Sequence, residues 1–257
     1  MTCSARYREI LRNLTDWEPF LLANSGLPGP RGNLELAQAV ADEGSEEQFR
    51  HWLSFGPDRA PVNSPEEFLA FCGILGLGAL LAGGGRSVET DPALTESPIR
   101  ILRYFAADPR WRSREAVAMA LQRWGDADVE ALLRAMAEWS HGTPWEQRAA
   151  AAALCEPRLL VKPAHAKATL HILDAITASL RQNRERKSES FRVLRKGLGY
   201  CWSVAVAAYP EVGKALMERW IGDPDPDIRW IMRENLRKNR LVRMDPTWTA
   251  RCFASLT

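Results

Sequence analysis

The strongest chemical signal in the chain is a dense run of basic side chains between residues 181 and 196. Seven of these 16 positions are Lys or Arg, and only Glu185 and Glu189 oppose them. Guanidinium and ammonium groups bind phosphate oxygens through charge-assisted hydrogen bonds. We therefore expect phosphate contacts here, and the alternative is a basic but merely solvated surface. The basic residues are Arg181, Arg184, Arg186, Lys187, Arg192, Arg195 and Lys196.

The charges are divided unequally along the chain. Residues 1–157 contain 15 Lys and Arg against 22 Asp and Glu, whereas residues 158–257 contain 19 against 10. The overall net charge of +2 therefore hides a basic C-terminal part. Such a division indicates a polyanionic partner, although Arg-rich solvated helices would give the same imbalance.

Several other kinds of site are excluded by spacing. Gly73, Gly76 and Gly78 lie inside an apolar helical pattern rather than between a strand and a helix, so we expect them to permit close helix packing and to bind no nucleotide. The Gly-rich segment 78–87 lacks the lysine of a phosphate-binding loop. The four histidines show no metal-ligand spacing, and no C-x-x-C pair or G-x-S-x-G elbow occurs. We expect no cofactor and no metal, and we interpret the five widely spaced cysteines as small core residues.

The chain shows no targeting or membrane pattern. Its longest apolar stretch, Phe68–Ala82, is shorter than the roughly 20 residues that a membrane helix needs. The first residues lack the apolar centre of a signal peptide. We expect a cytoplasmic protein without a membrane partner.

The elements that position the basic run are predicted to be helices throughout. Apolar residues recur at helical spacing, strand alternation is nearly absent, and helix starts are marked by a capping residue before a proline. Ser64-Pro65, Ser97-Pro98 and Thr143-Pro144 are such starts. The fold class is therefore predicted to be all-α.

Internal repetition predicts how the helices are arranged. When Asp108-Pro109 is aligned with Asp223-Pro224, Arg114 falls on Arg229 and Leu121 falls on Leu236. Pro144–Leu154 reads as a third copy and Phe191–Leu198 as a fourth, weaker one, and spacings of roughly 33 to 45 residues are typical of HEAT or armadillo helix pairs. We therefore expect one right-handed superhelical solenoid over residues 1–257, with divergent helices in 1–97 and HEAT-like repeats in 98–257.

Two segments resemble signatures of the HEAT-like DNA alkylation-repair glycosylases. Trp139–Ala150 is similar to a signature in which an aromatic-Trp pair precedes arginine and a small-residue helix. Phe191–Pro210 is similar to the next signature through Lys196-Gly197-Leu198-Gly199-Tyr200 and Tyr209-Pro210, and Asp225–Arg240 fits the closing repeat. The resemblance covers about residues 98–240.

The resemblance implies particular site residues. Trp145 and Arg148 match the tryptophan and arginine of the first signature, and Tyr200 stands where the family has a tryptophan facing DNA. The catalytic aspartate of the family follows a tryptophan by four positions, which implies Asp128 with Trp124, although the double tryptophan of the family is missing. Asp128 could equally cap the helix that follows it.

Two functions follow as expectations. The resemblance implies a basic concave face that binds duplex DNA, with Arg148, Trp145 and Tyr200 as the matched residues. The basic run adds Arg184, Arg192, Arg195 and Lys196 to the expected DNA-binding residues. It also implies excision of cationic alkylated purines, with a carboxylate that stabilises the developing sugar cation. The alternative is a non-catalytic scaffold that binds a protein partner on its concave face, because the same solenoid serves both functions.

Overall fold

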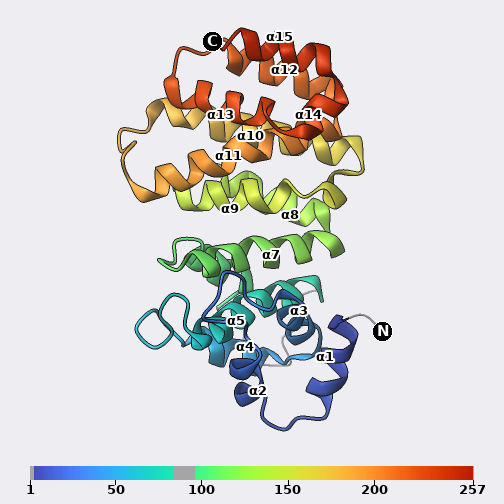
Figure 1. Cartoon of the computed structure of the whole chain (residues 1–257), viewed down its shortest axis with the longest axis vertical. Coiled ribbons are helices and arrows are strands. Elements are labelled where there is room, and N and C mark those ends of the chain that lie inside the picture. The colour runs from blue at the N-terminus through green and yellow to red at the C-terminus, as the bar shows by residue number, and fades with distance from the viewer. Residues whose placement is uncertain (1–2, 84–95, 257) are drawn as a thin grey trace. The chain divides into compact units, whose positions relative to one another are not determined.

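The computed structural model describes residues 3–83 and 96–256, and within these ranges every regular element is a helix (Figure 1). The all-α prediction is confirmed. The chain divides into two compact units, Met1–Ala127 and Asp128–Thr257. Of the Gly-rich segment 78–87, residues 84–87 lie outside the described residues.

Unit 1, Met1–Ala127, is built around one apolar helix. Its helices are α1 (Cys3–Arg12), α2 (Glu18–Ala23), α3 (Leu34–Glu43), α4 (Glu46–Leu53), α5 (Pro65–Ala82), α6 (Pro98–Phe105) and α7 (Trp111–Ala127). Helix α5 packs against α2, α3, α4, α6 and α7. It is long and apolar enough to cross a membrane by length and composition, yet 67% of it is buried inside the protein, as expected for a core helix.

The glycines of α5 permit this close packing. A Cβ on Gly78 would lie 2.3 Å from the Ala120 carbonyl oxygen of α7, and a Cβ on Gly76 would lie 2.3 Å from the Phe49 ring of α4. No side chain fits at such distances, so the backbones of α5 and its neighbours approach because glycine is present. The interpretation of these glycines as packing residues is confirmed.

Buried arginines fix the segment that enters α7. Arg110 is 1% exposed, pairs with Asp108 at 2.7 Å and donates to the Phe55 carbonyl at 2.8 Å. Arg114 donates to the Asp108 carbonyl at 2.7 Å. The Asp-Pro-x-x-x-x-Arg pattern found by sequence thus closes the turn before α7, since the arginine satisfies carbonyls that the turn leaves unpaired.

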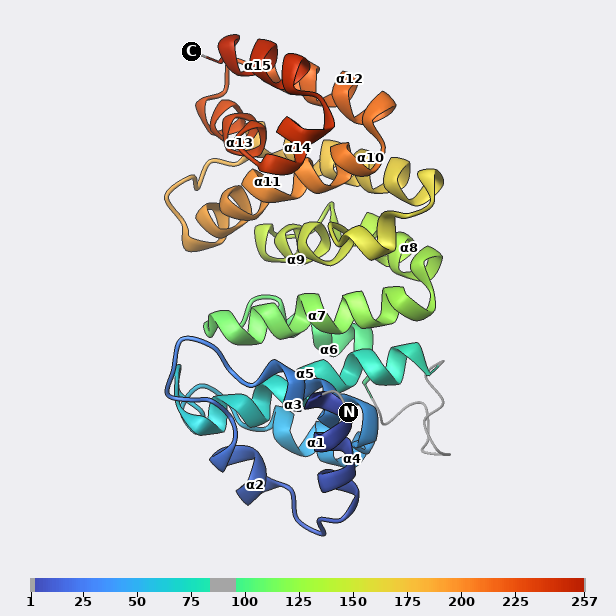
Figure 2. The same cartoon turned by 45° about the vertical axis from the view of Figure 1, so that its right-hand side comes forward.

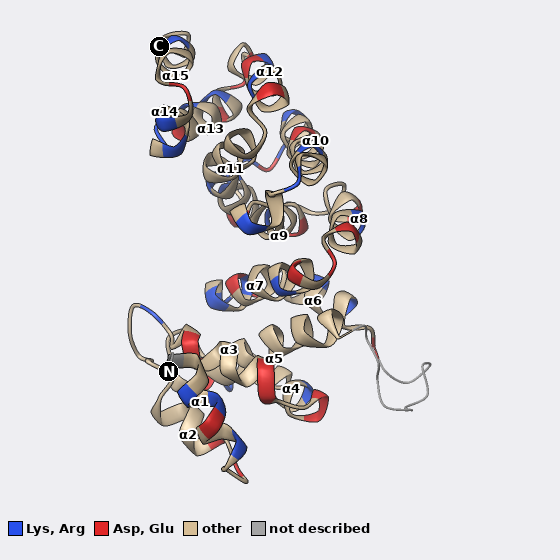
Figure 3. Ribbon diagram, turned by 90° about the vertical axis from the view of Figure 1, so that its right-hand side faces the viewer, with Lys and Arg blue, Asp and Glu red and all other residues tan. Residues whose placement is uncertain are grey.

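Unit 2, Asp128–Thr257, consists of consecutive helix pairs in two layers (Figures 2 and 3). Helices α8, α10 and α12 form one layer, and α9, α11 and α13 form the other, with α10 and α11 at the centre. The elements are α8 (Val129–Trp139), α9 (Pro144–Leu154), the 3₁₀ turn η1 (Pro157–Leu160), α10 (Pro163–Ser179), the 3₁₀ turn η2 (Leu180–Gln182), α11 (Glu189–Ala208), α12 (Pro210–Ile221), α13 (Pro226–Leu236), α14 (Asn239–Met244) and α15 (Pro246–Ala254).

Two of the three predicted helix starts have the expected cap. The Ser64 side chain accepts from the Glu67 N–H, and Thr143 forms a full capping box with Glu146. Helix α6 does begin at Pro98, but the Ser97 side chain makes no capping hydrogen bond, so that cap was wrong. Proline at the first helical position sets the start there through its fixed φ.

Tryptophans and cysteines contribute to the core of unit 2. Trp202 is fully buried and donates to the Thr177 hydroxyl at 3.0 Å, and Trp220 donates to Asp174 at 2.7 Å. These two tryptophans belong to the core, whereas Trp145 and Trp230 are half-buried. Of the five cysteines, the four with described side chains are buried and free, as predicted for small core residues: Cys72, Cys155, Cys201 and Cys252. Cys3 lies at a position whose side chain is not described.

Candidate nucleic-acid interface

Helix α11 presents an exposed polar stripe that carries three of the predicted site residues. Ser188 caps the helix by accepting from the Phe191 N–H at 3.2 Å, which sets its register. Arg192, Lys196 and Tyr200 then follow at four-residue spacing, and all three are exposed. Residues four apart lie on one side of a helix, so these side chains form a single row, which we call the α11 stripe.

Helix α9 lies along one side of the α11 stripe and carries Trp145 and Arg148. Both side chains are half-buried. A Cβ on Gly197 would lie 3.6 Å from Arg148 Cγ, so the aliphatic stem of Arg148 lies against α11 at Gly197.

The end of α13 and the start of α14 lie along the other side of the stripe. Tyr200 accepts a hydrogen bond from Arg240, whose guanidinium also lies 4.6 Å from the ring centroid. The Lys238 ammonium lies 5.9 Å from the same ring, and cations at such distances are attracted to the face of an aromatic ring. Figure 3 shows the basic colouring of α14.

Sequence reasoning missed Lys238 and Arg240. Their signal was present as the basic segment 237–243, in which four of seven residues are Arg or Lys. The link between this segment and Tyr200 is not visible in the sequence, because Tyr200 lies about 40 positions earlier. Only the packing of α11 against α14 brings the segment and Tyr200 together. Tyr200, Lys238 and Arg240 line an open hollow together with Arg237 and Arg243.

An acidic segment neutralises part of the basic run. Asp223, Asp225 and Asp227 precede and begin α13, and each pairs with an arginine that sequence reasoning had counted toward phosphate binding. Arg181 pairs with Asp223. Arg186 pairs with Asp225 at 2.5 Å and with Asp227 at 2.7 Å. Arg181 and Arg186 therefore form ion pairs with the segment that begins α13, and their charges are already compensated.

The pairing with Arg186 helps to lower the pKa of Asp225. Burial by itself would raise the pKa of the Asp225 carboxyl, but hydrogen bonds from Arg186 and from the Ile228 and Asp227 backbone N–H groups outweigh burial and lower the pKa. The same carboxylates raise the pKa of Arg186 above its ordinary value. Asp225 and Arg186 are therefore both ionised at neutral pH.

Arg195 belongs with the paired arginines. Its Nε lies 2.8 Å from Asp227 Oδ1, and its guanidinium lies 3.7 Å from the Trp230 ring centroid. Of the four residues of the basic run that we expect to bind DNA, Arg195 is the one whose charge is already compensated. Arg184, Arg192 and Lys196 are exposed and form no ion pair with any described residue. The same holds for Lys187.

The boundary between the two units falls between the two residues of the predicted catalytic pair. Asp128 is the N-cap of α8, where its Oδ1 accepts from the Ala131 N–H at 2.8 Å, and its side chain is exposed. Trp124 is a half-buried residue of α7 in unit 1. The geometry of Asp128 is the one that the helix-cap alternative predicts.

Comparisons with known proteins add no relative. No family model, no curated protein and no solved structure matches the chain. Among the described residues, no group of three His, Cys, Asp or Glu side chains could hold a metal ion. The function must therefore be argued from the interface itself.

Proposed function

We propose that unit 2 binds duplex DNA through the α11 stripe and the basic side chains beside it. The observation that supports this most directly is the sorting of charge. Arginines on the Asp223–Asp227 side are paired, whereas Arg192 and Lys196 extend from an exposed row without an acidic partner among the described residues. Uncompensated cations in a row are what a phosphate backbone requires.

The spacing of the row suits a nucleic-acid strand. Four helical residues rise about 6 Å, and the flexible stems of Arg192 and Lys196 let their charges reach successive phosphates. Tyr200, 47% exposed at the end of the row, offers a flat face for a sugar or an unstacked base. Lys238 and Arg240 lie beside the Tyr200 ring as further cations, and the Arg148 side chain lies against α11 at Gly197.

The arrangement of helices is compatible with this role. We propose that the two layers of unit 2 form a right-handed HEAT-like superhelix whose inner layer is α9, α11 and α13. The support is the order of contacts, since α9, α11 and α13 each pack on their own partner helix, and α11 packs on both α9 and α13. All residues of the proposed interface belong to this layer or to the start of α14.

The binding experiment compares two charge-matched double variants. Arg192→Ala/Lys196→Ala should weaken binding of a labelled duplex by about tenfold or more at low salt, because a hydrogen bond to a charged group contributes about 1.5 kcal/mol or more. The control is Lys162→Ala/Lys167→Ala, which removes two exposed charges at the start of α10 in the other layer. Equal weakening by both pairs, or no binding by the native protein, would favour the protein-scaffold alternative.

Base excision is the second step of the proposal and rests on the resemblance. A cationic alkylated purine is already a good leaving group, so the protein need supply little beyond a carboxylate near the sugar. Asp128→Asn is a clean test because asparagine caps a helix as well as aspartate does. If Asp128 stabilises the sugar cation, the variant keeps DNA affinity and loses release of methylated purines. Undiminished release by the variant would reduce Asp128 to a helix cap.

A further inference from the structure

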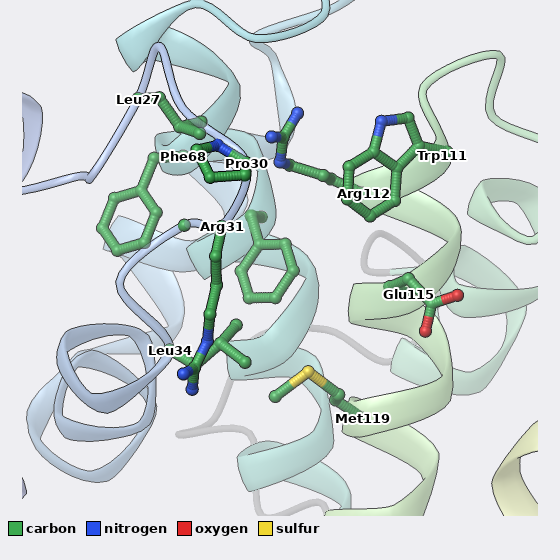
Figure 4. A pocket seen from close by; sticks show the side chains of 11 residues that line it. Leu27, Pro30, Arg31, Leu34, Phe68, Trp111, Arg112, Glu115 and Met119 are labelled. Carbon is green, nitrogen blue, oxygen red and sulfur yellow. The ribbon is translucent and has the colours of Figure 1, made fainter.

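The hollows of the two units differ in chemistry. In unit 1, a cavity of about 160 Å³ lies between α5, α7 and the segment 27–34, and most of the side chains that line it are apolar (Figure 4). The arginines at its wall are paired, Arg112 with Glu67 and Arg31 with Glu35. In unit 2, two open hollows adjoin each other, one basic and one apolar. A ligand that combines a negative charge with an apolar face is complementary to this second arrangement.

The basic hollow of unit 2 contains three cations that lack an acidic partner. It is lined by Tyr200 and by residues of α14 and of the connection that precedes α14. Arg237 of this lining pairs with a glutamate of α13 at 2.7 Å. Lys238, Arg240 and Arg243 also line it, and they form no ion pair with any described residue. Phosphate groups are therefore attracted to this hollow.

The second hollow is apolar and shares one cation with the first. It lies between η1 and the C-terminal part of α11, where Leu160 and Val161 face Val204 and Ala208. Val161 is 79% exposed, so much of this apolar surface is open to solvent. Arg240 lines both hollows, and the apolar surface therefore begins where the basic hollow ends.

The α11 stripe leads into both hollows. Tyr200 ends the exposed row that begins at Arg192, and the residue four positions further along α11 is the buried Val204, which lines the apolar hollow. If DNA follows the stripe, as proposed above, its backbone meets cations as far as Tyr200 and apolar surface beyond it. This change of chemistry along one helix matches the two parts of a nucleotide, a charged phosphate and an aromatic base.

An unpaired nucleotide has a base that is free to enter such a hollow. In a duplex, each base is paired and stacked on its neighbours, so it is not available to a protein surface. In a single strand, bases stack on aromatic side chains and on guanidinium planes. Tyr200 is 47% exposed, and the Arg240 guanidinium lies 4.6 Å from its ring centroid, so this pair provides both kinds of surface.

We propose that the two hollows bind an unpaired nucleotide of a single-stranded extension that adjoins the duplex. The base occupies the apolar hollow next to the Tyr200–Arg240 pair, and the phosphate binds Lys238 and Arg243 in the basic hollow. This inference rests on the proposed binding of duplex DNA by the α11 stripe, and it adds the class of DNA structure that unit 2 prefers.

The test measures the affinity of the full chain for four labelled DNAs at low salt. These are a blunt duplex, the same duplex with a short thymidine extension, the same duplex with an abasic extension of equal length, and the extended strand alone. Extensions are placed at the 5′ end and at the 3′ end in separate measurements. At one of the two ends, the thymidine extension should raise the affinity by about tenfold over the abasic extension, which adds the same phosphates without bases.

The outcomes separate this inference from the proposed function. Binding of the blunt duplex with equal affinity for thymidine and abasic extensions would overturn the nucleotide site and leave duplex binding standing. Binding of the extended DNAs without binding of the blunt duplex would support the nucleotide site and overturn duplex binding. Tighter binding of an acidic, leucine-containing peptide than of any of these DNAs would instead assign the hollows to a protein partner.

Variants place the binding in these hollows, with the ratio of affinities for thymidine and abasic extensions as the readout. A general loss of DNA binding leaves this ratio unchanged. Tyr200→Leu should bring the ratio close to one, whereas Tyr200→Phe keeps the ring and should keep the ratio. Val161→Asp places a carboxylate in the apolar hollow and should also lower it. The control Val62→Asp adds the same charge at an exposed position of unit 1 and should leave the ratio at its native value. An unchanged ratio in folded Tyr200→Leu and Val161→Asp variants would overturn the site.

Discussion

At the residue scale, the same residue types carry different roles because of what lies beside them. Arg195 and Lys196 are neighbours in sequence, yet Arg195 is held by Asp227 and Trp230 while Lys196 is exposed. Asp128 and Asp225 both cap helices, but only Asp225 also binds an arginine. The role of each side chain therefore depends on the one or two residues that it contacts. Substitutions of Asp128 and Asp225 test this.

Asp128 is expected to contribute to stability through its cap alone. Asp128→Ala should lower the free energy of unfolding by about 1 kcal/mol, because the Ala131 N–H loses its acceptor, while Asp128→Asn should change it by only a few tenths. Urea denaturation followed by circular dichroism gives both values. A large loss in the asparagine variant would mean that the charge, rather than the cap, matters to the fold.

The Arg186–Asp225 pair is expected to make stability depend on acid pH. The pKa of Asp225 is lowered in the folded state, so its ionised form stabilises the protein above the unfolded-state pKa of about 3.9, and that contribution is lost as the pH falls through the folded-state value. Asp225→Asn keeps an acceptor for the Asp227 and Ile228 N–H groups and removes the charge. The native protein should therefore be more stable than the variant at pH 6, and the difference should shrink as the pH falls below about 3.9 and through the lowered folded-state pKa. A difference that stays constant across urea titrations over this range would contradict the prediction.

At the element scale, small residues set how closely the helices approach. Gly78→Ala should destabilise unit 1 by about 1–3 kcal/mol, because the new methyl group would overlap the Ala120 backbone and force α5 away from α7. Gly56→Ala is the matched control, since a Cβ there meets nothing within 4 Å. Thermal unfolding measures both, and equal effects would show that the α5–α7 contact can relax.

The elements themselves were largely predictable from sequence, and their mutual contacts were not. Helical spacing and proline-marked starts gave the positions of α5, α6 and α9, because these signals act within a few residues. The pairing of Arg181 and Arg186 with Asp223 and Asp225 joins positions about 40 apart, and the contact of Tyr200 with Arg240 does the same. No local pattern encodes such pairs, so the sequence overestimated the free charge of the 181–196 run and missed the basic side chains at α14.

At the scale of the whole molecule, charge is separated between the two units. Unit 2 holds 21 Lys and Arg against 15 Asp and Glu, which gives it +6, and the remaining 13 against 17 leave unit 1 at −4. If unit 2 binds DNA as proposed, the polyanion is attracted to unit 2 and repelled by unit 1. The net charge of +2 for the whole chain hides this difference between the units. The difference becomes visible only when the charges are counted for each unit separately.

The dependence of DNA binding on salt concentration tests whether Arg192 and Lys196 contact phosphates. If Arg192 and Lys196 each neutralise one phosphate, log affinity for duplex DNA should fall linearly with log salt, and Arg192→Ala/Lys196→Ala should make the slope shallower by about 1.8, at roughly 0.9 per phosphate. The Lys162→Ala/Lys167→Ala control removes the same net charge, so a purely long-range effect of charge would change both slopes alike. A shallower slope confined to the α11 variant would assign the contacts to the stripe. Equal slopes in all three proteins would mean that DNA, if bound, is held by other residues of the chain.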